Sequence, residues 1–205
     1  MLSTEALLAL ATFAFVSSIT PGPNNLMLMA SGTTFGFART VPHLLGVAIG
    51  FVVMVLVVGA GLGQALRDAP SAWLALEIAG VAYLLYLAFR TATARPPSDD
   101  ASAAARSRPL TFAQAAAFQW VNPKAWTMAL TAVAAFVPAG DRVAGLVAVA
   151  LVFGAINLPS VGAWALAGAS LRRWLRRPYA HRAFSVGAAL LLVASLVPTI
   201  SSWAD

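Results

Sequence analysis

The amino-acid sequence predicts an all-α integral membrane protein with six transmembrane helices, arranged as two inverted three-helix repeats in which the first and fourth helices are broken. Three observations support this fold class. The 205-residue chain is 60% hydrophobic and 10% charged, with a mean hydropathy of +0.81, whereas soluble domains carry about 25% charged residues. Six stretches are almost free of charge, and proline motifs interrupt two of them at matching places.

Each of the six charge-poor stretches is long enough to cross a bilayer once, because a spanning helix needs about 20 apolar residues. Their only charged residues are Glu77 in the third stretch and Lys124 in the fourth. The first stretch contains a Pro-Gly-Pro break, and two full spans within it would be short, so one interrupted crossing is favoured. The six stretches cover residues 6–38, 44–66, 70–89, 110–140, 143–171 and 183–204.

The arginines predict the orientation of the chain. Six crossings place ten of the twelve arginines on one side of the membrane and two, Arg67 and Arg142, on the other. The positive-inside rule assigns the arginine-rich side to the cytoplasm, so both termini are expected outside. Because the arginines are scattered over separate loops, no nucleic-acid partner is expected.

The longest loop divides the chain into two halves. Residues 91–109 carry Pro-Pro-Ser-Asp-Asp and an Ala/Ser/Arg tract, which predicts a flexible cytoplasmic linker. A first repeat then covers residues 1–90 and a second covers residues 110–205, with three crossings each. An odd number of crossings per half makes any symmetry between the halves inverted.

The two breaks form the candidate binding site. Irregular backbone at membrane depth is tolerated only where it is buried in protein or lines a cavity, and both breaks fall roughly 20–24 Å along their helices, near the middle of the bilayer. In an inverted arrangement the N-termini of the two half-helices meet there, and their partial positive charge beside the Lys124 ammonium favours an anionic group such as a carboxylate. The candidate substrate-binding residues are Thr20, Pro21, Gly22, Pro23, Asn24, Asn25, Gln119, Asn122, Pro123 and Lys124.

The polar residues within the apolar stretches also have plainer interpretations. The Pro-Gly-Pro motif suits an ordinary turn between helices, and Lys124 could extend toward a membrane interface, although its central position favours function. Glu77 is either a coupling-proton carrier or a polar residue near the outer interface. Asn157, which precedes Pro159 in the fifth stretch, is interpreted as part of a packing kink.

Signals for an enzyme are weak. The chain has no cysteine, which excludes disulfides and thiolate metal sites, and it contains neither a His-Glu-x-x-His nor a Gly-x-Ser-x-Gly motif. No catalytic residue, metal or cofactor is therefore expected. An intramembrane enzyme using Lys124 as base or nucleophile and a passive channel stay as alternatives, but paired breaks at matching places suit a transporter best.

The same motifs resemble those of the LysE/RhtB family of bacterial amino-acid exporters. Residues 20–25, followed by Ser-Gly, Phe-Gly-Phe and Arg within 31–39, resemble its N-terminal signature, and residues 122–125 (Asn-Pro-Lys-Ala) resemble the signature of its second half. Residues 164–168 (Trp-Ala-Leu-Ala-Gly) resemble exporters of cysteine and O-acetylserine within that family.

The resemblance implies a multi-pass secondary transporter in the bacterial inner membrane that exports amino acids or close derivatives by proton-driven alternating access. Its partners would be an amino-acid substrate, protons and the lipid bilayer. The direction of transport and the energy coupling rest on the resemblance alone. The sequence leaves the particular amino acid open, and also the oligomeric state, because glycine-rich helix faces serve packing within a chain or between copies.

Overall fold

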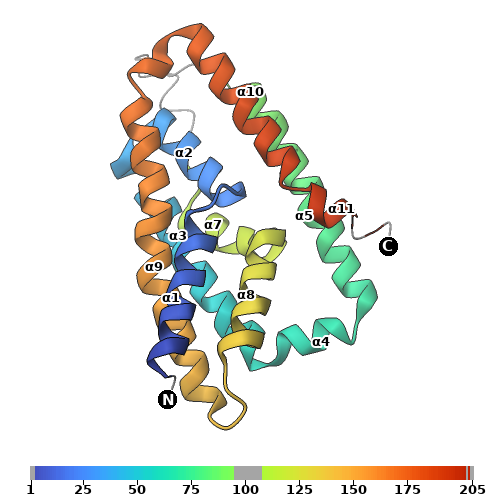
Figure 1. Cartoon of the computed structure of the whole chain (residues 1–205). Coiled ribbons are helices and arrows are strands. Elements are labelled where there is room, and N and C mark those ends of the chain that lie inside the picture. Colours follow the sequence, from blue (N-terminus) through green and yellow to red (C-terminus); the bar gives the residue numbers. More distant parts are fainter. Residues whose placement is uncertain (1–2, 95–107, 202, 204–205) are drawn as a thin grey trace.

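The computed structural model describes residues 3–94, 108–201 and 203, and every regular element within these residues is a helix. Helices α1, α3, α8 and α9 run roughly along one direction, and α5 and α10 lie side by side on one flank of the molecule, inclined to that direction (Figure 1). The elements are α1 Thr4–Ile19, α2 Pro23–Phe35, α3 Phe37–Val57, η1 Val58–Leu62, α4 Gly63–Arg67, α5 Pro70–Ala92, α7 Phe112–Phe118, η2 Gln119–Val121, α8 Pro123–Phe136, α9 Arg142–Leu171, η3 Trp174–Arg176, α10 Pro178–Ala194 and α11 Val197–Ser201.

The described residues contain four helices that are long and apolar enough to cross a membrane, or five if a bent pair is counted as one span. The pair is α1 and α2, and the chain bends by 53° at the break between them. The fourth predicted crossing, residues 110–140, is divided into α7 with 7 residues and α8 with 14. The all-helical membrane class is thus confirmed, whereas the count of six crossings and their inverted arrangement stay predictions. The four long helices are Phe37–Arg67, Pro70–Ala92, Arg142–Leu171 and Pro178–Ser201.

Several helices extend beyond the charge-poor stretches from which they were predicted. The helix containing α3 begins at Phe37, directly after Gly36, whose φ of 79° lies in the left-handed region that favours glycine. The last long helix begins at Pro178, where proline needs no backbone donor. Helix α5 includes the first two residues of the predicted linker, and residues 95–107 of that linker lie outside the described part of the chain.

Glycines allow two pairs of helices to approach closely. A side chain at Gly32 of α2 or at Gly168 of α9 would collide with the backbone of the facing helix. A Cβ atom at Gly50 of α3 would lie 2.7 Å from the Cα atom of Ala116 in α7. Small residues give this close backbone contact in membrane proteins, where packing holds helices together. Helix α2 is therefore held against α9, and α7 against α3.

An aromatic core joins α1, α3 and α9. The ring centroids of Phe51 and Phe153 are 5.2 Å apart, and those of Phe13 and Phe153 are 6.0 Å apart, both in edge-to-face geometry. Such pairs add to the stabilisation from burial alone. The core thereby fixes the three helices that surround the helix breaks.

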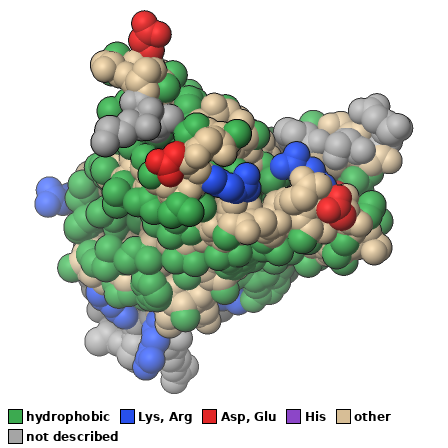
Figure 2. Space-filling model, turned by 90° about the horizontal axis from the view of Figure 1, so that it is seen from below, with side chains coloured by type: hydrophobic (Ala, Val, Ile, Leu, Met, Phe, Trp, Pro, Cys, Tyr) green, Lys and Arg blue, Asp and Glu red, His purple; other side chains and the backbone are tan. Residues whose placement is uncertain are grey.

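The outer surface is mostly apolar. Seen from the end that carries the N-terminus, hydrophobic side chains cover much of the visible face and charged side chains appear singly (Figure 2). Large apolar side chains such as Phe89 of α5, Leu151 of α9 and Leu190 of α10 are exposed. In a protein with several long apolar helices, such exposed apolar side chains along the sides of the helices are the ones expected to face lipid.

Candidate substrate site at the helix breaks

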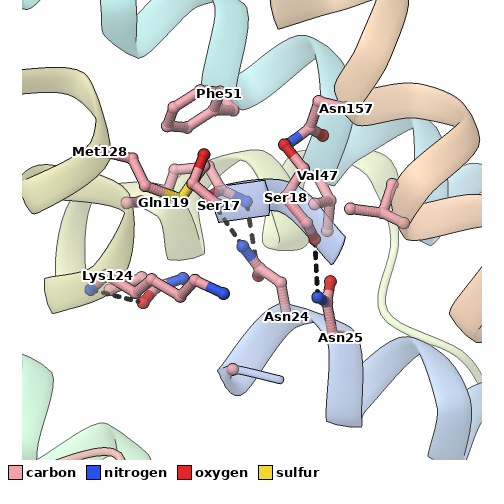
Figure 3. Close-up of a pocket in the computed structure, with 14 residues that line it drawn as sticks. Ser17, Ser18, Asn24, Asn25, Val47, Phe51, Gln119, Lys124, Met128 and Asn157 are labelled. Carbon is pink, nitrogen blue, oxygen red and sulfur yellow. Dashed lines mark hydrogen bonds between the residues drawn. The ribbon is translucent and has the colours of Figure 1, made fainter. Parts of the chain in front are cut away.

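The structure brings the two helix breaks into direct contact. Lys124 Nζ donates hydrogen bonds to the backbone oxygen of Thr20 at 2.7 Å, to its hydroxyl at 2.9 Å and to the backbone oxygen of Pro21 at 3.4 Å. Asn24 Nδ2 donates to Gln119 Oε1 at 3.0 Å (Figure 3). The second residue of each half-helix, Asn24 in α2 and Lys124 in α8, thus bonds to the break in the other half of the chain.

Local sequence explains why each half-helix starts where it does. Pro23 and Pro123 occupy the first turns of α2 and α8, where proline removes no needed donor. Asn122 caps α8, because its Oδ1 accepts from the backbone N–H of Lys124 at 3.1 Å. Gly22 precedes α2, and a Cβ atom there would lie 2.7 Å from Lys124 Cδ. A glycine at this position therefore leaves room for the lysine side chain.

The carbonyl groups freed at the end of α1 are all paired. The backbone oxygens of residues 18 and 20 accept from Asn25 Nδ2 at 2.8 and 2.7 Å, and that of residue 19 accepts from Trp164 Nε1 at 3.0 Å. The oxygen of residue 17 accepts from the Thr20 hydroxyl at 3.1 Å, and Lys124 bonds to residues 20 and 21. Because buried backbone polar groups need partners, these donors make a break in an apolar region stable.

A small cavity lies between the breaks and the central helices α3 and α9. Its volume is about 20 Å³, which is room for about one water molecule. Among the described residues around it, Lys124 is the only one with a formal charge. The lining residues are Ser17, Ser18, Gly22, Asn24, Asn25, Val47, Phe51, Gln119, Asn122, Lys124, Ala125, Met128, Asn157 and Val161.

Most of the predicted site residues meet at this cavity. Thr20 and Pro21 are exposed and hold Lys124 through their oxygens, whereas Pro23 and Pro123 begin the half-helices without lining the cavity. The carbonyls freed at the end of α1 are bonded to the protein itself. The predicted residues that line the cavity are Gly22, Asn24, Asn25, Gln119, Asn122 and Lys124.

Sequence reasoning missed the contribution of α9 to this cavity. Asn157 is 4% exposed, and its Nδ2 donates to Ser18 Oγ of α1 at 3.1 Å. Helix α9 continues through Pro159 without interruption. Asn157 therefore belongs to a continuous helix, and its side chain faces the end of α1, next to the first break. The sequence signal for this contribution was an amide side chain in an otherwise apolar stretch, and that side chain was interpreted as part of a packing kink.

Glu77 lies in a different place from the other candidates. It lines a second cavity of about 160 Å³ together with Pro123 and Trp126. Its Oε1 accepts from Trp73 Nε1 at 2.9 Å and its Oε2 accepts from Trp203 Nε1 at 2.8 Å. Glu77 therefore adjoins the α8 break from the side of α5 and does not line the small cavity that contains Lys124.

Comparison with known proteins gives one consistent result. A family profile described as LysE type translocator matches residues 15–197. The chain is 35% identical over 184 residues to proteins named cysteine/O-acetylserine efflux protein from Escherichia coli O157:H7, Escherichia coli K12 and Shigella sonnei. Each comparison covers 89% of this chain and 91% of the relative. No solved structure matches the chain significantly.

Proposed function

We propose that this chain, which belongs to the LysE family of translocators, exports small neutral amino acids or their close derivatives from the cytoplasm across the bacterial inner membrane. Its family consists of transporters, which excludes the alternative of an intramembrane enzyme using Lys124. The substrate class follows the relatives named for cysteine and O-acetylserine efflux. The observation that carries the proposal is the position of Lys124, whose ammonium bridges the two helix breaks.

The ammonium of Lys124 is the proposed receptor for the substrate carboxylate. A carboxylate that replaces the oxygens of Thr20 and Pro21 would form charge-assisted hydrogen bonds, which are stronger than bonds to neutral oxygens. Helix α2 starts beside Lys124, and no side chain of the described residues caps its N-terminus. Its free backbone N–H groups and partial positive charge add to the preference for an anion.

Pairwise packing supports the inverted three-helix repeats of the proposal. The broken helix of the first half packs against α9, and α7 and α8 of the second half pack against α3. The third long helices of the halves, α5 and α10, pack against each other. Exchanging the halves maps each of these pairings onto another or onto itself, as two repeats related by a pseudo-two-fold axis require, and the proposed three crossings per half make that symmetry inverted.

Alternating access is the proposed mechanism, and the small cavity corresponds to its closed state. A volume of about 20 Å³ cannot hold an amino acid, so the site opens by motion of one repeat against the other. Glu77 is the proposed proton carrier, because it adjoins Pro123 at the break of the second half. Lys124 itself is the alternative proton carrier.

Efflux from proteoliposomes loaded with labelled cysteine or O-acetylserine tests this function. Lys124→Met, which keeps the length of the side chain but removes its charge, is expected to reduce efflux at least about tenfold, since a hydrogen bond to a charged group contributes about 1.5–3 kcal/mol. Pro21→Ala keeps the backbone oxygen that Lys124 binds, and it is expected to reduce efflux because proline holds the preceding residue out of the helical conformation and so maintains the break. Tyr179→Ala, at a side chain that is 88% exposed, is the control. Unchanged efflux in both site variants, with folding verified by thermal unfolding, would remove the proposed site.

The same vesicles test coupling. Glu77→Gln is expected to retain substrate binding while its efflux no longer responds to an imposed proton gradient, because an amide cannot carry the proton. Full gradient-driven efflux in this variant would exclude Glu77 as the carrier. Efflux by the unmodified protein that does not saturate and ignores the gradient would instead favour the passive channel.

A further inference from the structure

Asn157 has an unused hydrogen-bond acceptor in the small cavity. Its side chain is 4% exposed, and its Nδ2 is committed to Ser18 Oγ at 3.1 Å. Its Oδ1 has no hydrogen-bond partner within the part of the chain that the structure describes. Buried polar atoms in folded proteins are nearly always paired, so this atom needs an explanation. Figure 3 shows the amide of Asn157 beside Ser18 of α1 at the cavity.

The surroundings of Asn157 make its oxygen available to a ligand. Val47, Phe51 and Met128 contribute apolar walls, and Ser17 uses its hydroxyl to donate to Phe13 within α1 at 2.6 Å. The carbonyl oxygens of residues 17–21 are paired with protein donors. Among the described side chains that line the cavity, Asn157 Oδ1 is the fully buried acceptor that lacks a hydrogen-bond partner.

We propose that the carboxamide oxygen of Asn157 accepts a hydrogen bond from the α-ammonium group of the substrate. This assignment rests on the proposed function, in which Lys124 holds the substrate carboxylate. An α-amino acid presents N–H donors at its ammonium group, and the derivative O-acetylserine has no other donor when its carboxylate is ionised. Pairing the open oxygen removes the penalty of leaving a buried acceptor without a partner. Because the acceptor carries no charge, it suits one ammonium group in a neutral amino acid.

Substrate analogues that lack one charged group test the assignment. Cysteine is compared with 3-mercaptopropionate, which lacks the ammonium, and with cysteamine, which lacks the carboxylate. Their competition against labelled cysteine is measured on the purified full-length protein in detergent under reducing conditions. The unmodified protein is expected to prefer cysteine over both analogues by about tenfold or more, as hydrogen bonds to charged groups require.

Asn157→Leu, which keeps the branching at Cγ but has no acceptor, is expected to lose the preference for cysteine over 3-mercaptopropionate. Its preference over cysteamine is expected to remain, because Lys124 is unchanged. Asn157→Asp, which keeps an acceptor but adds a negative charge, is expected to retain the preference over 3-mercaptopropionate. Ser160→Ala is the matched control, since Ser160 is also buried on α9 but donates within its own helix to Ile156 at 2.7 Å.

The outcomes separate this assignment from the proposed function. If Asn157→Leu keeps the full preference over 3-mercaptopropionate, or loses only the preference over cysteamine, then Asn157 does not bind the ammonium, although cysteine remains a ligand. If the unmodified protein does not bind cysteine competitively with O-acetylserine, the proposed function itself fails. A folded Asn157→Leu variant, verified by thermal unfolding, is required for each comparison.

Discussion

Gly22 shows how strongly one position constrains Lys124. A Cβ atom at residue 22 would lie 2.7 Å from Lys124 Cδ and 3.1 Å from its Nζ. The backbone there has a φ of −174°, which is extended and open to any residue. The added methyl would therefore meet the flexible end of one side chain and would fill space in the cavity.

Gly22→Ala is accordingly expected to weaken amino-acid binding about tenfold while changing the free energy of unfolding by less than about 1 kcal/mol. Binding to the purified protein and thermal unfolding measure the two effects. Gly140→Ala, at a position where a Cβ would meet nothing within 4 Å, is the control. Unaltered binding in folded Gly22→Ala would contradict the placement of Lys124 at the binding site.

Single residues also show what could be predicted from the sequence and what could not. The breaks at Pro21 and Pro123 were predicted because proline acts on its own backbone, and Lys124 because a lone charge in an apolar stretch is visible without coordinates. The partners of Asn157 and Trp164 were not predicted, because they depend on how α9 is rotated against α1. The Trp73 donor to Glu77 lies four residues earlier on the same helix, whereas the Trp203 donor depends on how α5 lies against the C-terminal end of the chain.

Among the helices, the contact of α2 with α9 is where packing is least tolerant. A Cβ at Gly168 would collide with the backbone of Met29, including a Cα atom at 3.0 Å, and neither backbone can yield without separating the helices. Gly187 of α10 has nothing within 4 Å of a built Cβ. The two glycines are therefore a matched pair in long apolar helices of the same protein.

Gly168→Ala is expected to lower the free energy of unfolding by about 1–3 kcal/mol, the usual cost of overpacking. Gly187→Ala is expected to be neutral or to stabilise by up to about 1 kcal/mol, because alanine favours a helix. Thermal unfolding in detergent, followed by tryptophan fluorescence, measures both. Equal stability of the two variants would mean that α2 and α9 do not meet as the structure shows.

For the molecule as a whole, the absence of cysteine allows each loop to be located by labelling. Cysteine introduced at Asp68 or Gly140 is expected to react with a membrane-impermeant maleimide in right-side-out vesicles. Cysteine introduced at Thr93 or Tyr179 is expected to react only after permeabilisation. These four residues are exposed in the structure, and the unmodified chain, which contains no cysteine, supplies the unlabelled background.

The labelling shows whether α7 and α8 together cross the membrane, which the lengths of these helices do not decide. Thr93 precedes α7 and α8, and Gly140 follows them, so labelling from opposite sides requires this broken pair to traverse the bilayer. Reaction of both residues from one side would make the pair a re-entrant loop. The two halves would then have unequal numbers of crossings, and the inverted repeat would be wrong.

The bonds between Lys124 and the end of α1 have a consequence for the membrane in which the protein resides. Two interrupted helices that face each other within a membrane could form a polar pathway for water. Such a pathway would dissipate the ion gradients across the membrane. Here the Lys124 side chain lies between the two breaks through its bonds to residues 20 and 21, and the cavity beside it has room for about one water molecule. In the proposed carrier, this arrangement is expected to limit the leak of water and ions until a substrate displaces the bonds of Lys124.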